Sequence, residues 1–351
     1  RSGRTRLEEG RVSSAVGLLR QAEMRVDKAN NHRQEGRVLA ELLGDALVAV
    51  GEDGEAVDYY QQALETAGLS DTEAEARRLR LKLARTLKRR RRFEQVRQVV
   101  ADYFAETELD VPDAQGGDWR FVGLLVKFTL LQWLEWFGGW ETEWIDDQQL
   151  DEELAHREAG RLQSATLVDD QFPLTPWFRY TLGLRALSAR DPRLLAVTYI
   201  SQGISWCSGE KPSAEYARQF RDAALQRLES GGRARIRLHV GATAAILSLR
   251  IGDREEALDC ARRYLPVAID GGAFSDYVRL LEVLVWLALQ EGNLGAAEHF
   301  TPRLTVDVRA FGGAEMRHVT RLFQARVEFL RGNYREAREC IDAARSVNTR
   351  V

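Results

Sequence analysis

The residues whose types and spacing could perform chemistry lie mainly in one acidic run. From position 146 to 153 the chain reads Asp-Asp-Gln-Gln-Leu-Asp-Glu-Glu. Clustered carboxylates are the oxygen ligands with which Mg²⁺ can hold a diphosphate group. The spacing differs from that of an aspartate-rich diphosphate motif, however, and no second acidic motif with suitable helical spacing accompanies it. We therefore interpret the run as a solvated segment between helices.

Histidine, cysteine and nucleophile patterns add no further chemical site. None of the five histidines has HExxH spacing, and none sits beside a cysteine at ligand spacing. The sequence contains neither a Gly-x-Ser-x-Gly nucleophile motif nor a P-loop phosphate motif. Cys207, Cys260 and Cys340 are too scattered for a disulfide framework and read as small core side chains. We predict a chain without catalytic activity, cofactor or metal ion.

The charge is nearly balanced in total but uneven along the sequence. The 351 residues carry 50 Lys and Arg against 53 Asp and Glu, and 44% of them are hydrophobic, so core material is ample. Residues 77–92 hold ten basic side chains and no acidic one, whereas residues 135–153 hold eight acidic side chains and no basic one. Such blocks indicate contacts with partners. Aromatic residues are sparse near the basic block, which disfavours nucleic acid.

The sequence favours a cytoplasmic protein. Its low cysteine content suits a reducing compartment, and its charged start does not resemble a signal peptide. The most apolar stretch, residues 121–137, is short for a membrane crossing and contains Lys127 and Glu135. Because the chain begins at Arg1 rather than at a methionine, we expect it to be a piece of a longer protein.

The helices that position these residues are predicted from a recurring sequence motif, called the phrase below, which runs from a glycine to an alanine five positions later. Copies begin at Gly10, Gly51, Gly252, Gly292 and Gly332, with a degenerate copy from Arg91 to Val96 and a looser one from Gly209 to Ala214. The last position steps from 15 to 56 to 96, and from 257 to 297 to 337. A period of 40 or 41 residues is typical of a helical-repeat architecture.

The phrase has a direct physical meaning. Glycine supplies the positive φ of a helix C-terminus, and the alanine lets two antiparallel helices approach closely. An apolar stripe with a period of 3.6 follows the alanine, as in Ala56, Tyr60 and Ala63. Each unit is therefore a helical hairpin that must stack on its neighbours to bury its apolar face. Strand patterns are missing apart from short ambiguous pieces such as residues 305–308.

These hairpins resemble the tetratricopeptide repeat over residues 1–104 and 233–349. The residues that carry the resemblance are Leu43, Gly44, Gly51, Ala56, Tyr60 and Ala63 in one copy, and Gly332, Asn333, Tyr334, Ala337 and Ala344 in another. The long period is similar to that of helical repeats in bacterial signalling proteins. These include activators of the maltose-regulon type and kinases or cyclases that carry an AAA-type ATPase module. The resemblance implies an all-α, right-handed α-α superhelix.

The middle of the chain fits the repeat poorly and is rich in tryptophan. We divide the chain into N-terminal repeats (1–104), a degenerate or inserted segment (105–232) and C-terminal repeats (233–351). One continuous solenoid is favoured over two short solenoids joined by a bundle. Trp133, Trp136, Trp140 and Trp144 recur at helical spacing. Such a stripe is typical of a core, and its alternative is an aromatic platform for a partner.

The resemblance also implies a concave groove lined by the first helix of each hairpin. The positions carried over repeat by repeat are Glu41, Asp45, Arg78, Arg85, Lys88, Arg89, His239, Arg250, Arg279, Glu282, Trp286, Arg326 and Phe329. Most of the charged members are basic, so we expect the groove to receive an acidic segment, such as residues 135–153 of its own or a neighbouring molecule. For the basic run 88–92, the competing interpretation is a solvated helix end.

These observations predict a non-catalytic protein-protein interaction and regulatory module of a larger bacterial signalling or transcription-regulating protein. Its partner is expected to be a protein, either an acidic segment or a neighbouring domain of the same protein. The alternative is a sensor that holds a small-molecule inducer in the superhelix. An all-helical enzyme is a third hypothesis, which the absence of convergent acid, base or metal ligands disfavours. Nucleic acid and membrane partners are not expected.

Overall fold

The computed structural model describes residues 12–26, 33–67, 73–107, 109, 118–138, 143–164, 174–208, 212–229, 233–270, 274–311 and 314–349, and no strand occurs among them. The helices are α2 (Val12–Val26), α3 (Arg33–Val50), α4 (Asp53–Ala67), α5 (Glu73–Arg89), α6 (Phe93–Ala105), α7 (Asp118–Gly138), α8 (Asp147–Ser164), α9 (Leu174–Ala189), α10 (Pro192–Ser208), α11 (Ala214–Glu229), α12 (Ala234–Arg250), α13 (Arg254–Asp270), α14 (Phe274–Gln290), α15 (Leu294–Phe311), α16 (Ala314–Leu330) and α17 (Tyr334–Thr349). The predicted all-α class is confirmed, and the ambiguous residues 305–308 belong to α15.

The predicted turns inside the hairpins share one backbone conformation. The glycines with positive φ are Gly51 (84°), Gly252 (85°), Gly292 (68°) and Gly332 (83°). In each turn the next backbone N–H closes a Schellman motif, as Asp253 does by donating to the Ser248 carbonyl at 2.9 Å. The degenerate copy keeps this conformation without a glycine, since Arg91 has a φ of 56°. The turn therefore has the same left-handed geometry in this copy, although the residue type differs.

The small residue that ends each phrase is buried between the helices. Ala15, Ala56, Val96, Ala257, Ala297 and Ala337 are at most 4% exposed. The looser copy is a correction, because Ala214 is exposed and Ala217 is fully buried in its place. The Ala217 N–H donates to the Ser213 carbonyl at 3.0 Å, so the helix begins later than the phrase indicated. Since Ala217 lies 40 residues before Ala257, the regular period includes the α10–α11 hairpin.

Glycines inside the helices allow aromatic rings to pack against the backbone. A Cβ atom on Gly241 would lie 2.3 Å from the ring of Tyr264, and one on Gly44 would lie 2.6 Å from the ring of Tyr60. Real Cβ atoms do not approach other atoms so closely, and the dense packing of the core leaves the ring no space into which it could move. The two helices of these hairpins are therefore held together by a ring that occupies the space a side chain would fill.

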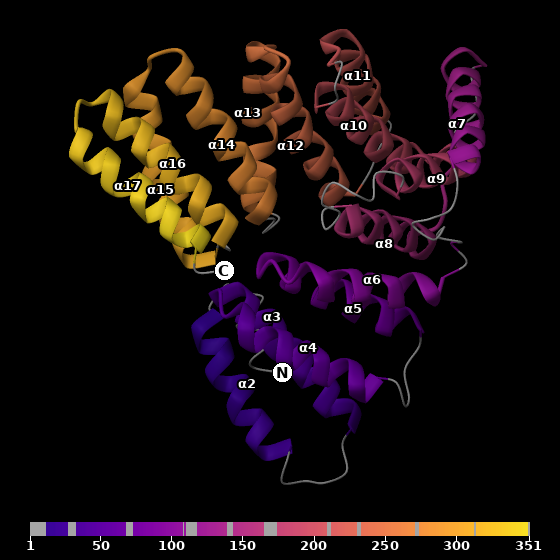
Figure 1. The fold of residues 1–351 in the computed structure, drawn as a ribbon, viewed down its shortest axis with the longest axis horizontal. Helices are drawn as coiled ribbons and strands as arrows, with labels where there is room; N and C mark the ends of the chain where they lie inside the picture. The colour runs from indigo at the N-terminus through magenta and orange to yellow at the C-terminus, as the bar shows by residue number, and fades with distance from the viewer. Residues whose placement is uncertain are drawn as a thin grey trace.

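The middle of the chain departs from the regular pairing. Helix α7 packs against α9, whereas α8 packs against both α5 and α6. The α8–α9 hairpin therefore follows the α5–α6 hairpin directly, and α7 is an additional helix at the edge of the molecule (Figure 1). Helix α8 contributes Leu150 to the buried cluster that extends to α14, and Ala159 to the cluster that extends back to α3. The packing of α8 thus connects the N-terminal repeats with the C-terminal repeats. The division of the chain at 104/105 and 232/233 stays a prediction.

The stacked hairpins form an α-α superhelix. In the second half of the chain, first helices of successive hairpins pack on each other, as α10 does on α12 and α12 does on α14. The curvature brings distant parts of the chain together, since α15 contacts α3. Figure 1 shows the C-terminal hairpins returning toward the N-terminal ones in this way. The inner side of the superhelix is consequently narrow, and side chains from non-consecutive helices can meet there.

Candidate partner-binding groove

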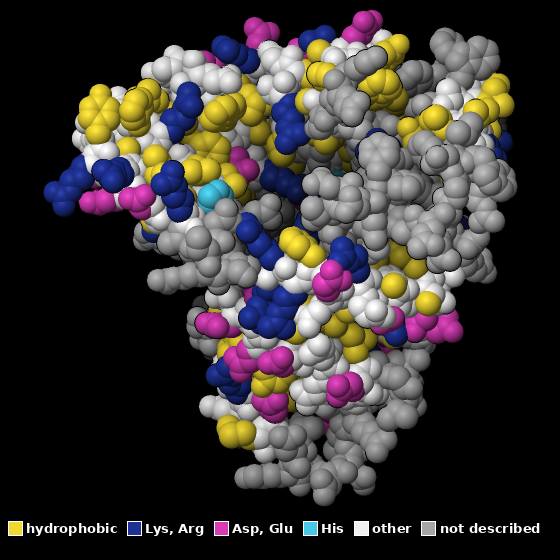
Figure 2. Space-filling view, viewed as in Figure 1, with side chains coloured by type: hydrophobic (Ala, Val, Ile, Leu, Met, Phe, Trp, Pro, Cys, Tyr) yellow, Lys and Arg dark blue, Asp and Glu magenta, His cyan; other side chains and the backbone are white. Residues whose placement is uncertain are grey.

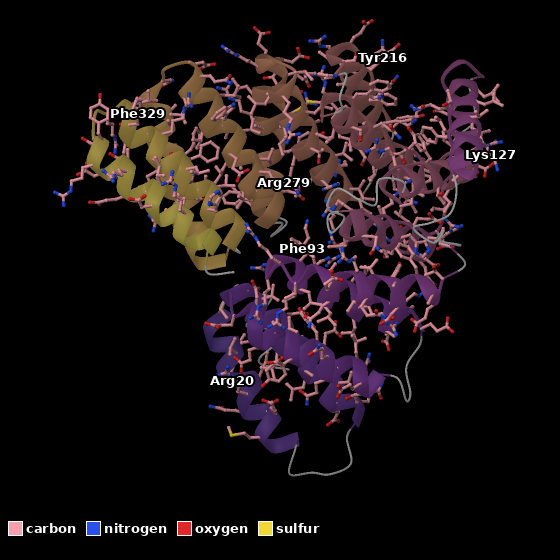
Figure 3. All side chains as sticks on the ribbon, in the orientation of Figure 1. Arg20, Phe93, Lys127, Tyr216, Arg279 and Phe329 are labelled. Carbon is pink, nitrogen blue, oxygen red and sulfur yellow. The ribbon has the colours of Figure 1, made fainter. Side chains whose placement is uncertain are left out.

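Arginines from three hairpins converge on the inner side of the superhelix. The charges of Arg85 on α5 and Arg279 on α14 both act on Arg161 of α8. Because α14 packs on α12, α13 and α15, Arg279 approaches Arg161 across the superhelix rather than along a packed interface. Figure 2 shows a hollow in the middle of this face with Lys and Arg side chains around it, and Figure 3 places Arg279 toward it. We treat this hollow as the candidate groove.

Three of the predicted groove residues meet at the N-terminal end. Glu41 accepts hydrogen bonds from Arg78 at 2.8 Å and from Lys82 at 2.7 Å. Asp45 accepts from Lys82 at 2.7 Å and from the Tyr60 hydroxyl at 2.7 Å. Burial and the carboxylate of Asp45 raise the pKa of Tyr60, so its hydroxyl remains a donor. This end of the groove is therefore a network of satisfied charges.

The basic run of α5 is divided between the groove and the hairpin turn. Arg85 donates through two nitrogens to the two carboxylate oxygens of Glu158 on α8. Arg89 instead lies 3.4 Å from Asp53 at the start of α4, and Lys88 is half-buried near the end of α5. The structure thus brings Arg85 to α8 but ties Arg89 to its own neighbouring hairpin.

A second charged cluster lies at the C-terminal side of the groove. Asp276 on α14 lies 3.7 Å from His239 Nδ1 and 3.5 Å from Arg279 Nη1. Burial raises the pKa of Asp276, but the nearby His239 and the cations of Arg279 and Arg161 outweigh it, so the net effect is a lowered pKa. Asp276 therefore stays ionised. Glu282 is half-buried further along α14, and Arg250 is exposed at the end of α12.

Aromatic residues extend this wall toward the last hairpin. The Arg326 guanidinium lies over the Trp286 ring at 5.1 Å, and Phe323 meets the same ring edge-on at 6.1 Å. Such a stacked guanidinium is held in place while its N–H groups stay available to a ligand. Phe329 is 59% exposed and packs on Tyr334 at the turn between α16 and α17.

The predicted aromatic platform is only partly described. The side chains of Trp133, Trp136 and Trp140 lie outside the described residues. Trp144 does not continue their helix, because α7 ends at Gly138 and residues 143–146 are non-helical. Its ring is 51% exposed, with the Arg193 guanidinium 5.0 Å above it. The four tryptophans therefore do not form one helical stripe.

The carboxylates that the structure describes within the acidic stretch 135–153 do not occupy the groove of their own chain. These carboxylates pair with other arginines: Glu135 with Arg227, Glu143 with Arg190, Asp147 with Arg193 and Arg233, Asp151 with Arg233, Glu152 with Arg77, and Glu153 with Arg185. These pairs join α7 and α8 to neighbouring helices. The expectation that this stretch binds in the groove of its own molecule is therefore corrected, because its described carboxylates hold neighbouring helices together instead.

Sequence reasoning missed four groove residues: Lys82, Glu158, Arg161 and Asp276. Two of them could have been found, since Lys82 follows Arg78 by four positions and Asp276 precedes Arg279 by three, which places each pair on one helix face. The other two lie on α8, which does not carry the repeated phrase. No register could be transferred to that helix.

The described residues supply two further findings. No group of three or more His, Cys, Asp or Glu side chains within them could hold a metal ion. Among the same residues, no helix combines the length and the apolar character that a membrane crossing requires.

Comparisons with known proteins identify the class of fold. No protein-family model and no curated protein match the sequence. Among solved structures, the chain is similar to a Rap protein complexed with competence and sporulation factor, with a TM-score of 0.55 and 11% identity over 96% of this chain and 80% of that chain. A match to yeast Tom70 has a TM-score of only 0.30, with 12% identity over 100% of this chain and 75% of that chain, and supports no argument. The chain is thus a tetratricopeptide-like helical-repeat protein in its fold.

Proposed function

We propose that this chain is a non-catalytic regulatory module that binds an acidic segment of a protein partner in its concave groove. The observation that carries the proposal is that Arg85, Arg161 and Arg279 come near one another from three separate hairpins, with Arg85 bonded to α8 and Arg279 held on α14. Stacked hairpins offer extended concave surfaces of this kind to their partners. Arginine suits the task because its planar guanidinium can hold a carboxylate with two hydrogen bonds.

The biological setting is part of the same proposal. The similar Rap protein was solved in complex with competence and sporulation factor, which agrees with a partner held by such a superhelix. We place the chain in the cytoplasm, as the regulatory arm of a bacterial signalling or transcription-regulating protein. Activators of the maltose-regulon type remain the expected comparison, from the long repeat period.

A small-molecule inducer is the second candidate, and a pocket among the described residues gives it little support. One pocket is lined by Leu289, Gly292, Leu294 and Leu330, and it offers no polar side chain to orient a metabolite. A thermal-shift screen of metabolites tests this candidate, because a ligand that binds only the folded state raises the unfolding midpoint.

The proposed function is tested with a fluorescent oligoglutamate peptide and an oligoglutamine peptide of the same length. We expect the protein to bind oligoglutamate more tightly, and the preference to weaken as salt screens the charges. Replacing Arg78 and Arg85 together by glutamine is expected to weaken binding about tenfold, because charge-assisted hydrogen bonds are lost. Fluorescence anisotropy gives both affinities.

The matched control is the double substitution Arg335→Gln and Arg338→Gln on α17. Both side chains are 85% exposed, so this variant also removes two positive charges, but from outside the groove. We expect it to bind oligoglutamate as the unmodified protein does. Equal binding of oligoglutamate and oligoglutamine by the unmodified protein would rule out the proposed function.

A further inference from the structure

Arg161 is a groove cation to which no carboxylate of the described residues is bonded. Within the described part of the chain it makes no salt bridge and no hydrogen bond through its side chain. It is exposed to solvent. Yet protein groups surround it, and burial followed by the nearby cation of Arg279 lowers its pKa. Its guanidinium is therefore near the Arg279 cation while water still reaches the side chain.

The carboxylates nearest to Arg161 are already engaged. Glu158 precedes it by one helical turn, so both lie on the same face of α8, but both Glu158 oxygens accept hydrogen bonds from Arg85. Asp276 across the hollow lies between His239 and Arg279. The cluster therefore contains three guanidinium groups and two carboxylates, and one positive charge is left over.

We infer that Arg161, between Arg85 and Arg279, is the anchor that binds one carboxylate of an acidic peptide segment. The inference rests on the proposed function and names the site within it. A side-chain carboxylate entering the hollow would supply the missing negative charge and accept two hydrogen bonds from the Arg161 guanidinium. Arg85 and Arg279 are held in position by Glu158 and Asp276, so the site is organised before the ligand arrives.

A peptide fits this wall better than a nucleic acid does. Glu41, Asp45 and Asp276 stand along the groove between the cations. A phosphate backbone carries a charge at every nucleotide and would meet these carboxylates, whereas a peptide needs to place only one of its carboxylates at Arg161 and can turn the others to solvent. Charge complementarity at one point therefore favours a protein ligand.

The test compares Arg161→Gln with the exposed control Arg338→Gln in anisotropy titrations with oligoglutamate. We expect about tenfold weaker binding for Arg161→Gln and no change for the control. Arg161→Lys keeps the charge but loses the paired hydrogen bonds, so its affinity is expected to lie between the two. Unchanged binding by Arg161→Gln, with weak binding by the Arg78 and Arg85 double variant, would overturn the inference and leave the proposed function standing.

A second measurement examines the site without a peptide. At equal ionic strength, citrate is expected to raise the thermal midpoint of the unmodified protein above its value in chloride by more than it does for Arg161→Gln. An equal response of the two proteins would overturn the anchor site even if oligoglutamate binds. Tighter binding of single-stranded DNA than of oligoglutamate, with the same dependence on Arg161, would overturn the peptide assignment.

Discussion

Asp253 illustrates how a single residue serves both a turn and an interface. Its backbone carbonyl accepts the Ala257 N–H at the start of α13. Its carboxylate accepts hydrogen bonds from Arg218 at 2.7 Å and from Arg221 at 2.8 Å, which tie α11 to the next hairpin. The hydrogen bond from Arg218 is the largest cause that lowers the pKa of Asp253 to about 2.

This lowered pKa predicts an acid-sensitive contribution to stability. A carboxylate whose folded pKa lies below its unfolded value of about 3.9 stabilises the protein above that pH, and this contribution is lost as the pH falls through the folded value. We expect Asp253→Asn to be less stable than the unmodified protein at neutral pH. The difference is expected to shrink between pH 4 and pH 2, as measured by urea unfolding at a series of pH values. A difference that persists unchanged at pH 2 would contradict the assigned role.

At the scale of the element, the hairpin turn requires a left-handed residue. Arg91 supplies it at a φ of 56°, where four other turns have glycine. A residue with a Cβ pays a steric cost there, because its side chain approaches the following carbonyl. The copy that begins at Arg91 is degenerate in sequence because an arginine stands where the other copies have glycine.

We therefore expect Arg91→Gly to stabilise the protein by about 1 kcal/mol, after the entropic cost of glycine is subtracted. The reverse substitution, Gly252→Arg, places a side chain at a φ of 85° and is expected to destabilise by a similar or larger amount. Chemical denaturation measures both free energies of unfolding. A loss of stability in Arg91→Gly would indicate that the arginine side chain matters more than the backbone conformation.

At the scale of the whole molecule, continuity through the middle depends on a buried charge cluster. Asp191 is fully buried at the junction of α9 and α10, where it accepts from the Arg193 guanidinium at 2.8 Å and from the Ile145 N–H at 3.2 Å. Arg193 also donates to the Ile145 carbonyl at 2.7 Å and lies 3.2 Å from Asp147. The cluster fastens the start of α8 to α10, and so joins the two sides of the solenoid.

We expect Asp191→Ala to lower the free energy of unfolding by about 3–5 kcal/mol, because it removes the buried carboxylate that pairs with the buried Arg193 guanidinium. Since repeat proteins are stabilised by neighbouring interfaces, the loss is also expected to divide one calorimetric unfolding transition into two. Asp191→Asn keeps an acceptor oxygen and serves as the milder comparison. A single transition at nearly the original midpoint in Asp191→Ala would argue against this junction as the link.

The sequence by itself determined the hairpins and their class of fold. Gly252, Ala257 and their counterparts act through backbone conformation and close helix contact, which are local properties, so a 40-residue pattern was sufficient to predict them. Only the tertiary structure decided that α8 follows the α5–α6 hairpin and that α7 stands outside the order. The same is true of Arg161, which meets Arg279 only because small rotations between successive hairpins accumulate into curvature. Electrostatic partners are chosen by distance in space, and that distance depends on every interface between them.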